Sequence, residues 1–307
     1  MNKVRLIIAT IVVAMLAACG TTRTVPVSGR KQSLMVSDAE ILSLSQQEYT
    51  KYMSAAKKST DAANTQMVKR VGQRLANAVE TYLRQNNMEA EVQHFQWEFN
   101  LVADKAVNAF CMPGGKIVVY EGLLPVTQNE ASLAIVLGHE IAHAVAKHSA
   151  EQMSKQIKQQ YGMQIGGTVL GALGMGETTS SILSTVVAQG FQFRNLKYSR
   201  DHESEADYMG LIFAAMAGYD PQVAVAFWQR MAAQSGGGGN DIFSDHPSDA
   251  KRIKQIQQWM PQALAVYNGG TVATNNSTTT AKNATSNTKQ TKKQPTTATR
   301  TIHIGNK

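Results

Sequence analysis

Two histidines and a glutamate occur together in the sequence Gly138-His139-Glu140-Ile141-Ala142-His143. Residues four positions apart on an α-helix share one face about one turn apart, so both imidazoles can reach one metal ion. Imidazole is a favoured ligand of zinc, and the pair predicts one Zn²⁺ per subunit. Glu140 follows His139 directly and can reach a water on the open side of such a metal. The pattern therefore predicts hydrolysis at a carbonyl group, with Glu140 accepting the proton of the water.

A catalytic zinc usually has three protein ligands, so the chain must supply one more. Position 149 is Ser149, which excludes a third histidine six residues after the second. His148 is out of register with the histidine pair on a continued helix, and we expect it at the surface. The remaining source is the acidic cluster Asp201-His202-Glu203-Ser204-Glu205-Ala206-Asp207. On a helix Glu203 and Glu205 point about 200° apart, so either one can face the metal, and periodicity leaves both open.

A helix and a small sheet must position these groups. Thr127 and Glu130 fit a capping box, with Thr127 as the N-cap of the helix that carries both histidines. Residues 94–102 alternate apolar and polar side chains, which indicates a strand. Residues 106–110 continue extended, and a turn at residues 113–115 leads to a further strand at 116–120. We predict an α+β fold, mainly helical, with a small antiparallel sheet beside the active-site helix.

Apolar periodicity predicts most of the remaining chain to be helical. The expected segments are a helix opening at Ser37, and helices near residues 67–83, 149–165, 180–192, 201–219 and 247–260. We divide the chain into a signal peptide (1–18), a tether with an N-terminal helix (19–60), a metallopeptidase domain (61–262) and a disordered tail (263–307). The tail is basic and rich in Thr, Asn and Lys, and it lacks the apolar content needed for folding.

The N-terminus has the features of an export signal. Lys3 and Arg5 precede the apolar run from Leu6 to Ala18, which is short for a membrane span. The run ends in Leu16-Ala17-Ala18-Cys19, which resembles a bacterial lipobox, with cleavage before the cysteine and lipidation of Cys19. We therefore expect a lipid-anchored protein of the cell envelope, at the outer membrane and facing the periplasm.

The net charge of +8 does not indicate nucleic-acid binding, because it is confined to the ends of the chain. Two basic residues lie in the signal segment, and six more lie in the last 38 residues, which contain no acid. Residues 19–269 therefore have a formal charge of zero. A basic groove on the folded body is not supported, and we expect no nucleic-acid partner.

Four motifs, in this order along the chain, resemble the M48 metallopeptidases, a family that includes HtpX-type quality-control peptidases and CAAX prenyl proteases. The similarity is greatest to the exported lipoprotein members. The matching segments are Asn108-Ala109-Phe110 with Pro113-Gly114-Gly115, Val136 to His143, Tyr198-Ser199-Arg200 with Glu203 to Asp207, and His246-Pro247 with Arg252. Together they cover about residues 60–260.

This resemblance implies a zincin-like fold with Glu203 as the third zinc ligand. It implies that Asp207 either orients a ligating histidine or serves in proton transfer. Asn108, Ala109 and Phe110 would lie on an edge strand where an extended substrate adds through main-chain hydrogen bonds. His246 follows a Gly-rich loop and is either a latch on the zinc or a structural loop residue.

The resemblance and the export signal together imply a zinc-dependent endopeptidase that hydrolyses misfolded or unassembled cell-envelope proteins. The alternative is a chaperone or assembly factor for envelope proteins whose zinc site is mostly latched. Cys111 stands where the family often has a small or apolar residue, and we expect it to pack. Arg200 either pairs with the nearby acids or stabilises an oxyanion.

Overall fold

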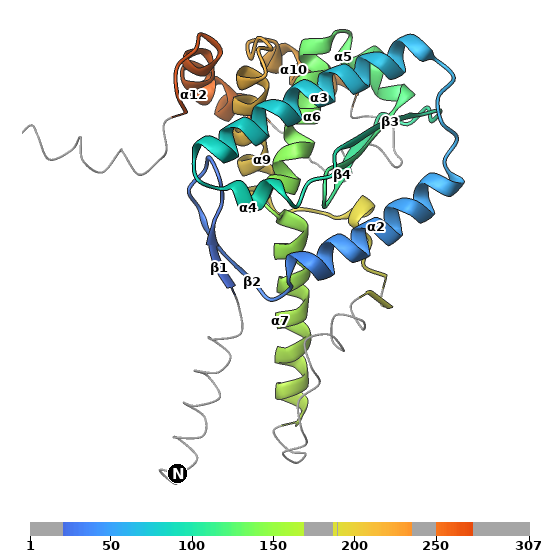
Figure 1. Ribbon diagram of the computed structural model, residues 1–307, viewed down its shortest axis with the longest axis vertical. Helices are drawn as coiled ribbons and strands as arrows, with labels where there is room; N and C mark the ends of the chain where they lie inside the picture. Colours follow the sequence, from blue (N-terminus) through green and yellow to red (C-terminus); the bar gives the residue numbers. More distant parts are fainter. Residues whose placement is uncertain (1–20, 169–186, 189, 235–249, 273–307) are drawn as a thin grey trace, which may run out of the picture. The chain divides into compact units, whose positions relative to one another are not determined.

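The computed structural model describes residues 21–168, 187–188, 190–234 and 250–272 of the 307-residue chain (Figure 1). Its long helices are α2 (Asp38–Ala55), α3 (Ala62–Gln85), α6 (Glu130–Val145), α7 (His148–Thr168), α9 (Arg200–Met216), α10 (Val223–Gln234) and α12 (Ala250–Tyr267). Short helical turns are α4 (Glu89–Val92), η1 (Glu121–Leu123), α5 (Leu124–Thr127) and η2 (Phe193–Asn195). The strands are β1 (Thr21–Thr24), β2 (Lys31–Leu34), β3 (Glu98–Val102), β4 (Ala109–Met112) and β5 (Lys116–Tyr120). The mainly helical α+β prediction is confirmed.

The sheet beside α6 has the strand order β3-β5-β4, so β4 is an edge strand. The expected antiparallel pairing holds for β4 and β5, which the tight turn after Met112 joins. In contrast, β3 runs parallel to β5, with Phe99 opposite Ile117. The chain therefore crosses over between β3 and β5 through β4, and the small sheet is mixed.

The side chains of the sheet alternate between two cores. Ala109 and Cys111 of β4 belong to the larger core with α3, α6 and α9. Phe110 and Met112 point to the opposite face and pack in a second core with residues of α2 and α7. Figure 1 shows α2 and α3 on opposite sides of the sheet. Because both faces are covered, every residue of β4 and β5 is buried.

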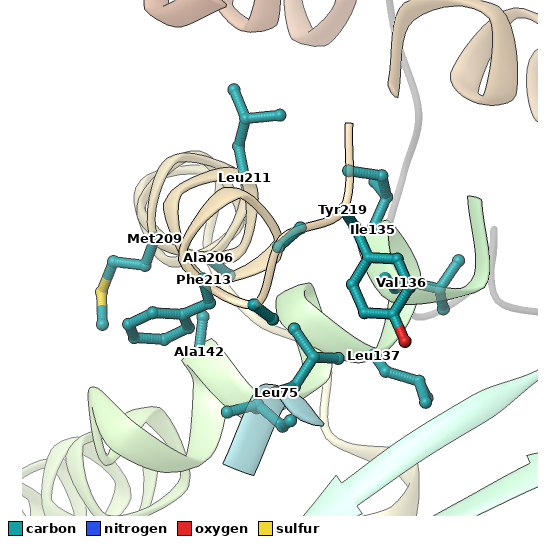
Figure 2. Close-up of a cluster of buried hydrophobic side chains, with 14 of the residues drawn as sticks. Leu75, Ile135, Val136, Leu137, Ala142, Ala206, Met209, Leu211, Phe213 and Tyr219 are labelled. Atoms are coloured by element: carbon teal, nitrogen blue, oxygen red, sulfur yellow. The ribbon is translucent and has the colours of Figure 1, made fainter. Parts of the chain in front are cut away.

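Helices α6 and α9 form the centre of the larger core. Apolar residues of both helices pack together with Leu75 of α3, and Figure 2 shows Ala142 of α6 beside Phe213 and Ala206 of α9. A glycine on each helix permits the close approach. A Cβ atom on Gly138 would lie 2.6 Å from the carbonyl oxygen of Gly210. The two backbones are thus in direct contact next to His139.

The substitution Gly210→Ala should destabilise the fold by about 1–3 kcal/mol, the usual range for overpacking a core. The added Cβ would lie 2.6 Å from the backbone nitrogen of His139, so α9 must move away from α6. Urea unfolding of the purified protein measures the change. If the helices were not in contact here, alanine would instead stabilise α9 by about 1 kcal/mol through its higher helix propensity. A rise in stability would therefore contradict the packing.

The start of α6 differs from the prediction. Its N-cap is Asn129, whose side chain accepts a hydrogen bond from the backbone nitrogen of Ser132. Thr127 is buried at the end of α5, and its hydroxyl donates to the carbonyl of Leu124. The predicted capping box at Thr127 is therefore wrong. The cause is the left-handed backbone of Gln128, with φ of 66°, which separates α5 from α6. Helix α2 begins after Ser37 as expected, and Ser37 forms a capping box with Glu40.

The predicted tether is also wrong over residues 21–34. These residues form the antiparallel hairpin of β1 and β2, with Thr21 opposite Leu34. Val25 and Val27 in its turn are buried in the larger core. The strands themselves are short and polar (TTRT and KQSL), so their pattern resembles that of a solvated linker.

Helix α12 runs to Tyr267, beyond the predicted start of the tail at residue 263. Several predictions fall outside the described residues: the signal segment, Cys19, the loop with His246, most of the helix at 180–192 and the tail from residue 273. Among the helices that the structure describes, none combines the length and apolar character required to cross a bilayer.

Candidate metal centre

Three residues from two helices form a candidate metal site. His139 and His143 come from α6 and Glu203 comes from the first turn of α9. One ligand atom from each lies within 4.8 Å of the others. The Nε2 atoms of the two histidines are 3.1 Å apart. The two carboxylate oxygens of Glu203 lie 3.5 Å from Nε2 of His139 and 3.6 Å from Nε2 of His143. The predicted set of ligands is thus brought together in the buried interior.

On one side of the site, a carboxylate and a guanidinium fix His139 and Glu203. Oδ1 of Asp207, one turn along α9, lies 2.9 Å from Nδ1 of His139. A carboxylate only accepts hydrogen bonds, so Nδ1 carries the proton and Nε2 keeps its lone pair for a metal. Arg252 of α12 donates to Asp207 at 2.6 Å and to Glu203 at 2.8 Å. Its guanidinium also stacks on Trp228 at 4.1 Å.

On the other side, His143 is held by aromatic and imidazole groups. Its Nδ1 lies 2.9 Å from Nδ1 of His148, and the Nε2 of His148 lies 2.9 Å from Glu205. The ring of Tyr198 stacks on His143 with centroids 4.1 Å apart. The hydroxyl of Tyr198 is 2.9 Å from that of Ser149. Each metal-facing imidazole therefore has a partner on its outer nitrogen, as is usual for metal-binding histidines.

The electrostatics of these residues suit a divalent cation. With neutral imidazoles, the buried carboxylates Glu140, Glu203 and Asp207 and the guanidinium of Arg252 together carry a charge of −2, which Zn²⁺ cancels. Burial opposes protonation of His139, but Asp207 and Glu203 outweigh it and raise its pKa to about 9. The site therefore favours positive charge between its ligands. Two imidazoles and one carboxylate are also a donor set that catalytic zinc uses.

Glu140 is buried next to His139 on α6, the helix that packs against the edge strand β4. Burial first, and then the charge of Glu140, raise the pKa of the Cys111 thiol on β4. The same charge adds to burial in raising the pKa of Tyr198, so that hydroxyl stays protonated. The charge of Glu140 thus acts on one residue of β4 and on the ring that stacks on His143. A buried carboxylate beside His139 is a candidate for the base that hydrolysis at the metal requires.

The comparison with known families follows from this geometry. The model of peptidase family M48 matches residues 62–260, which include the two histidines, Glu140 and Glu203. The chain belongs to this family. Zinc is the metal of M48 peptidases, and the buried triad fits it.

Relatives within the M48 family include proteases of bacteria and mitochondria. The chain is 34% identical over 170 residues to the mitochondrial metalloendopeptidase OMA1 of Schizosaccharomyces pombe, covering 55% of this chain and 48% of that protein. It is 28% identical over 247 residues to human OMA1, and this match covers 78% of this chain and 46% of that protein. The beta-barrel assembly-enhancing protease of Yersinia pestis is 29% identical over 180 residues, covering 57% of this chain and 34% of that protein. The chain thus matches about half or less of the length of these relatives.

Other predicted site residues lie as follows. Asp207 contacts His139, which agrees with an orienting position. Ala109 and Phe110 lie on the edge strand β4 and Asn108 precedes it, and all three side chains are buried. Arg200 is exposed at the start of α9. Cys111 is buried and free, as expected for a packing residue.

The surface position predicted for His148 is wrong, because this residue is fully buried against His143 and Glu205. The prediction continued the α6 helix past its end. Lys147 instead adopts a left-handed conformation with φ of 54°, so α7 starts in a new direction and turns His148 back towards the centre. The sequence also did not predict that Arg252 bridges Asp207 and Glu203, although Arg252 belongs to one of the four motifs.

Proposed function

We propose that this protein is a zinc endopeptidase that hydrolyses peptide bonds in misfolded or unassembled cell-envelope proteins. The observation that carries the proposal is the buried triad of His139, His143 and Glu203, with Glu140 beside it. The match to peptidase family M48 over residues 62–260 supports it.

The residues of the chain divide the chemistry among them. His139 and His143 would hold zinc through Nε2, and Glu203 through its carboxylate. When bound, zinc lowers the pKa of water and polarises the peptide carbonyl. The carboxylate of Glu140 takes a proton from the attacking water and delivers it to the nitrogen of the leaving amine. Asp207 keeps the proton of His139 on Nδ1, and Arg252 limits the repulsion between Asp207 and Glu203.

An extended peptide would bind along β4. Asn108, Ala109 and Phe110 belong to this edge, and α6 packs against the same strand. Main-chain hydrogen bonds to a strand edge hold a substrate without demanding one sequence, which suits a protease acting on unfolded chains. In this structure the strand is buried, so binding requires the segment around η2, which contacts β4, to move.

The cellular assignment rests on the predicted export signal and lipidation of Cys19, which place the domain in the envelope, at the outer membrane and facing the periplasm. A relative from Yersinia pestis is named a beta-barrel assembly-enhancing protease, which is consistent with envelope substrates. The membrane is then a partner through the lipid anchor. For His246 both expectations stand, a latch on the zinc or a structural loop residue.

The full chain, purified in mild detergent and loaded with zinc, should cleave a reduced and unfolded model protein at internal peptide bonds. Mass spectrometry of the products would show new N-termini within the substrate. A chelator should stop cleavage and added zinc should restore it. A zinc-loaded protein that leaves several unfolded substrates intact would contradict the proposal.

The burial of the whole centre favours a second candidate, a chaperone or assembly factor with a mostly closed zinc site. Cells that carry only Glu140→Gln separate the two functions. Loss of envelope integrity in these cells supports the peptidase, whereas full protection by the variant supports the chaperone.

A further inference from the structure

The turn of the β1–β2 hairpin is held in one unusual conformation. Val27 has φ of 64°, a region that β-branched residues rarely adopt because of steric strain. Its side chain is buried in the larger core, and its backbone nitrogen donates to the hydroxyl of Tyr82 at 3.2 Å. Such strain persists only where the surroundings over-determine the backbone. The turn therefore presents the next residues, Ser28 and Arg30, in a fixed direction.

Ser28 and Arg30 reach a buried acid on α9. The hydroxyl of Ser28 donates to one oxygen of Glu205. Nε of Arg30 donates to the other oxygen at 2.8 Å. The other end of the same guanidinium forms two hydrogen bonds with Glu151 of α7, at 2.9 and 2.7 Å. Both oxygens of the buried Glu205 side chain therefore accept hydrogen bonds from the hairpin.

Hydrogen bonds connect Glu205 to His143 through the ring of His148. The carboxylate that accepts from Ser28 and Arg30 also lies 2.9 Å from Nε2 of His148. In the tautomer of His148 with its proton on Nε2, that nitrogen donates to Glu205 and Nδ1 is an acceptor. His143 then donates from its own Nδ1 to Nδ1 of His148, at 2.9 Å. The lone pair of His143 therefore lies on Nε2, which faces His139 and Glu203.

We propose that the β1–β2 hairpin is a positioning element of the metal centre, which sets the tautomer and orientation of His143 through Glu205 and His148. This inference rests on the proposed zinc site. The family match begins at residue 62, so Ser28 and Arg30 lie outside the segment that the match describes. Asp207 orients His139 directly, whereas Glu205 orients His143 through an intervening imidazole.

Metal binding by the full chain in mild detergent tests the proposal without relying on catalysis. Zinc affinity is measured by competition with a chromophoric chelator, and the visible spectrum of the Co²⁺-loaded protein reports ligand geometry. The variants His148→Leu and Arg30→Gln should each bind zinc about 10–100-fold more weakly, the usual effect of losing a group behind a metal ligand. His148→Asn, which can place an acceptor near the former Nδ1, should recover part of the affinity and of the spectrum. Arg84→Gln, which removes an exposed helix pair with Glu80, is the matched arginine control and should change neither.

The outcomes separate this inference from the proposed function. A wild-type chain that binds neither Zn²⁺ nor Co²⁺ overturns the proposed zinc site. A wild type that binds both, beside folded His148→Leu and Arg30→Gln variants with unchanged affinity and spectrum, overturns the positioning role alone. Glu151→Gln controls for loosening of the hairpin, because Glu151 binds Arg30 without touching Glu205's partner His148. Glu151→Gln could weaken zinc binding as much as Arg30→Gln does. In that case attachment of the hairpin to the domain explains the effect, rather than the hydrogen bonds through Glu205 and His148, and the proposal fails.

Discussion

Replacing Glu140 by glutamine is expected to lower kcat/KM for an unfolded substrate by about 10²–10⁴-fold, the contribution of a positioned general base. Glutamine has nearly the same size and fills the same buried place, but its amide cannot accept a proton from water at neutral pH. His139, His143 and Glu203 are unchanged, so one zinc per chain should remain bound. Initial rates of cleavage and metal analysis of the same preparation give the two quantities.

A matched control separates the base from a general effect of removing an acid from α6. Glu130 begins the same helix and forms a partly exposed ion pair with Arg70. Glu130→Gln should leave both rate and zinc content near those of the wild type. Cleavage at the wild-type rate by Glu140→Gln would show that Glu140 is not the base. Loss of zinc from Glu140→Gln would instead give it a structural part in the site.

The substitution Arg252→Leu is expected to destabilise the metal-free protein by about 3–5 kcal/mol, the typical effect of removing one partner from a buried ion pair. Arg252 is buried and bridges Asp207 and Glu203, so its loss leaves two carboxylates facing each other. The zinc-loaded variant should lose less of its free energy of unfolding, because Zn²⁺ supplies positive charge beside Glu203. Urea unfolding of both forms, with and without zinc, measures this difference.

Arg230→Leu is a suitable control for losing a large cationic side chain. Arg230 donates to the carbonyls of Val126 and Thr127 and to the hydroxyl of Ser132, and none of these partners is charged. Its replacement should cost about 1 kcal/mol for each lost hydrogen bond and depend little on zinc. Equal destabilisation of Arg252→Leu in the metal-free and zinc-loaded forms would contradict the charge-balancing part of Arg252.

The local pattern was sufficient to predict the helix that carries His139, Glu140 and His143, because four-residue spacing and apolar periodicity both act within that segment. The same reasoning could not choose between Glu203 and Glu205. Both lie on one helix, and what distinguishes them is which distant element meets each face. Glu203 meets α6 and Arg252, whereas Glu205 meets Arg30, 175 residues earlier in the chain.

The errors in the predicted fold have local physical causes. Single residues in the left-handed conformation, Gln128 and Lys147, end one helix and redirect the next, and neither residue type signals such a change. The polar hairpin at residues 21–34 is stabilised by partners from α7 and α9 rather than by its own pattern. The parallel pairing of β3 with β5 depends on a crossover that alternation within each strand does not reveal.

X-ray absorption at the zinc edge, recorded on the purified full chain, tests the central claim most directly. The triad predicts one zinc per chain with two imidazole ligands, oxygen ligands and no sulfur in the coordination shell, and Glu203→Ala should lose most of the metal. Glu205→Ala should retain the same ligand types with weaker binding. A zinc–sulfur contribution, which would place Cys111 on the metal, or a wild-type chain without bound zinc would contradict the account.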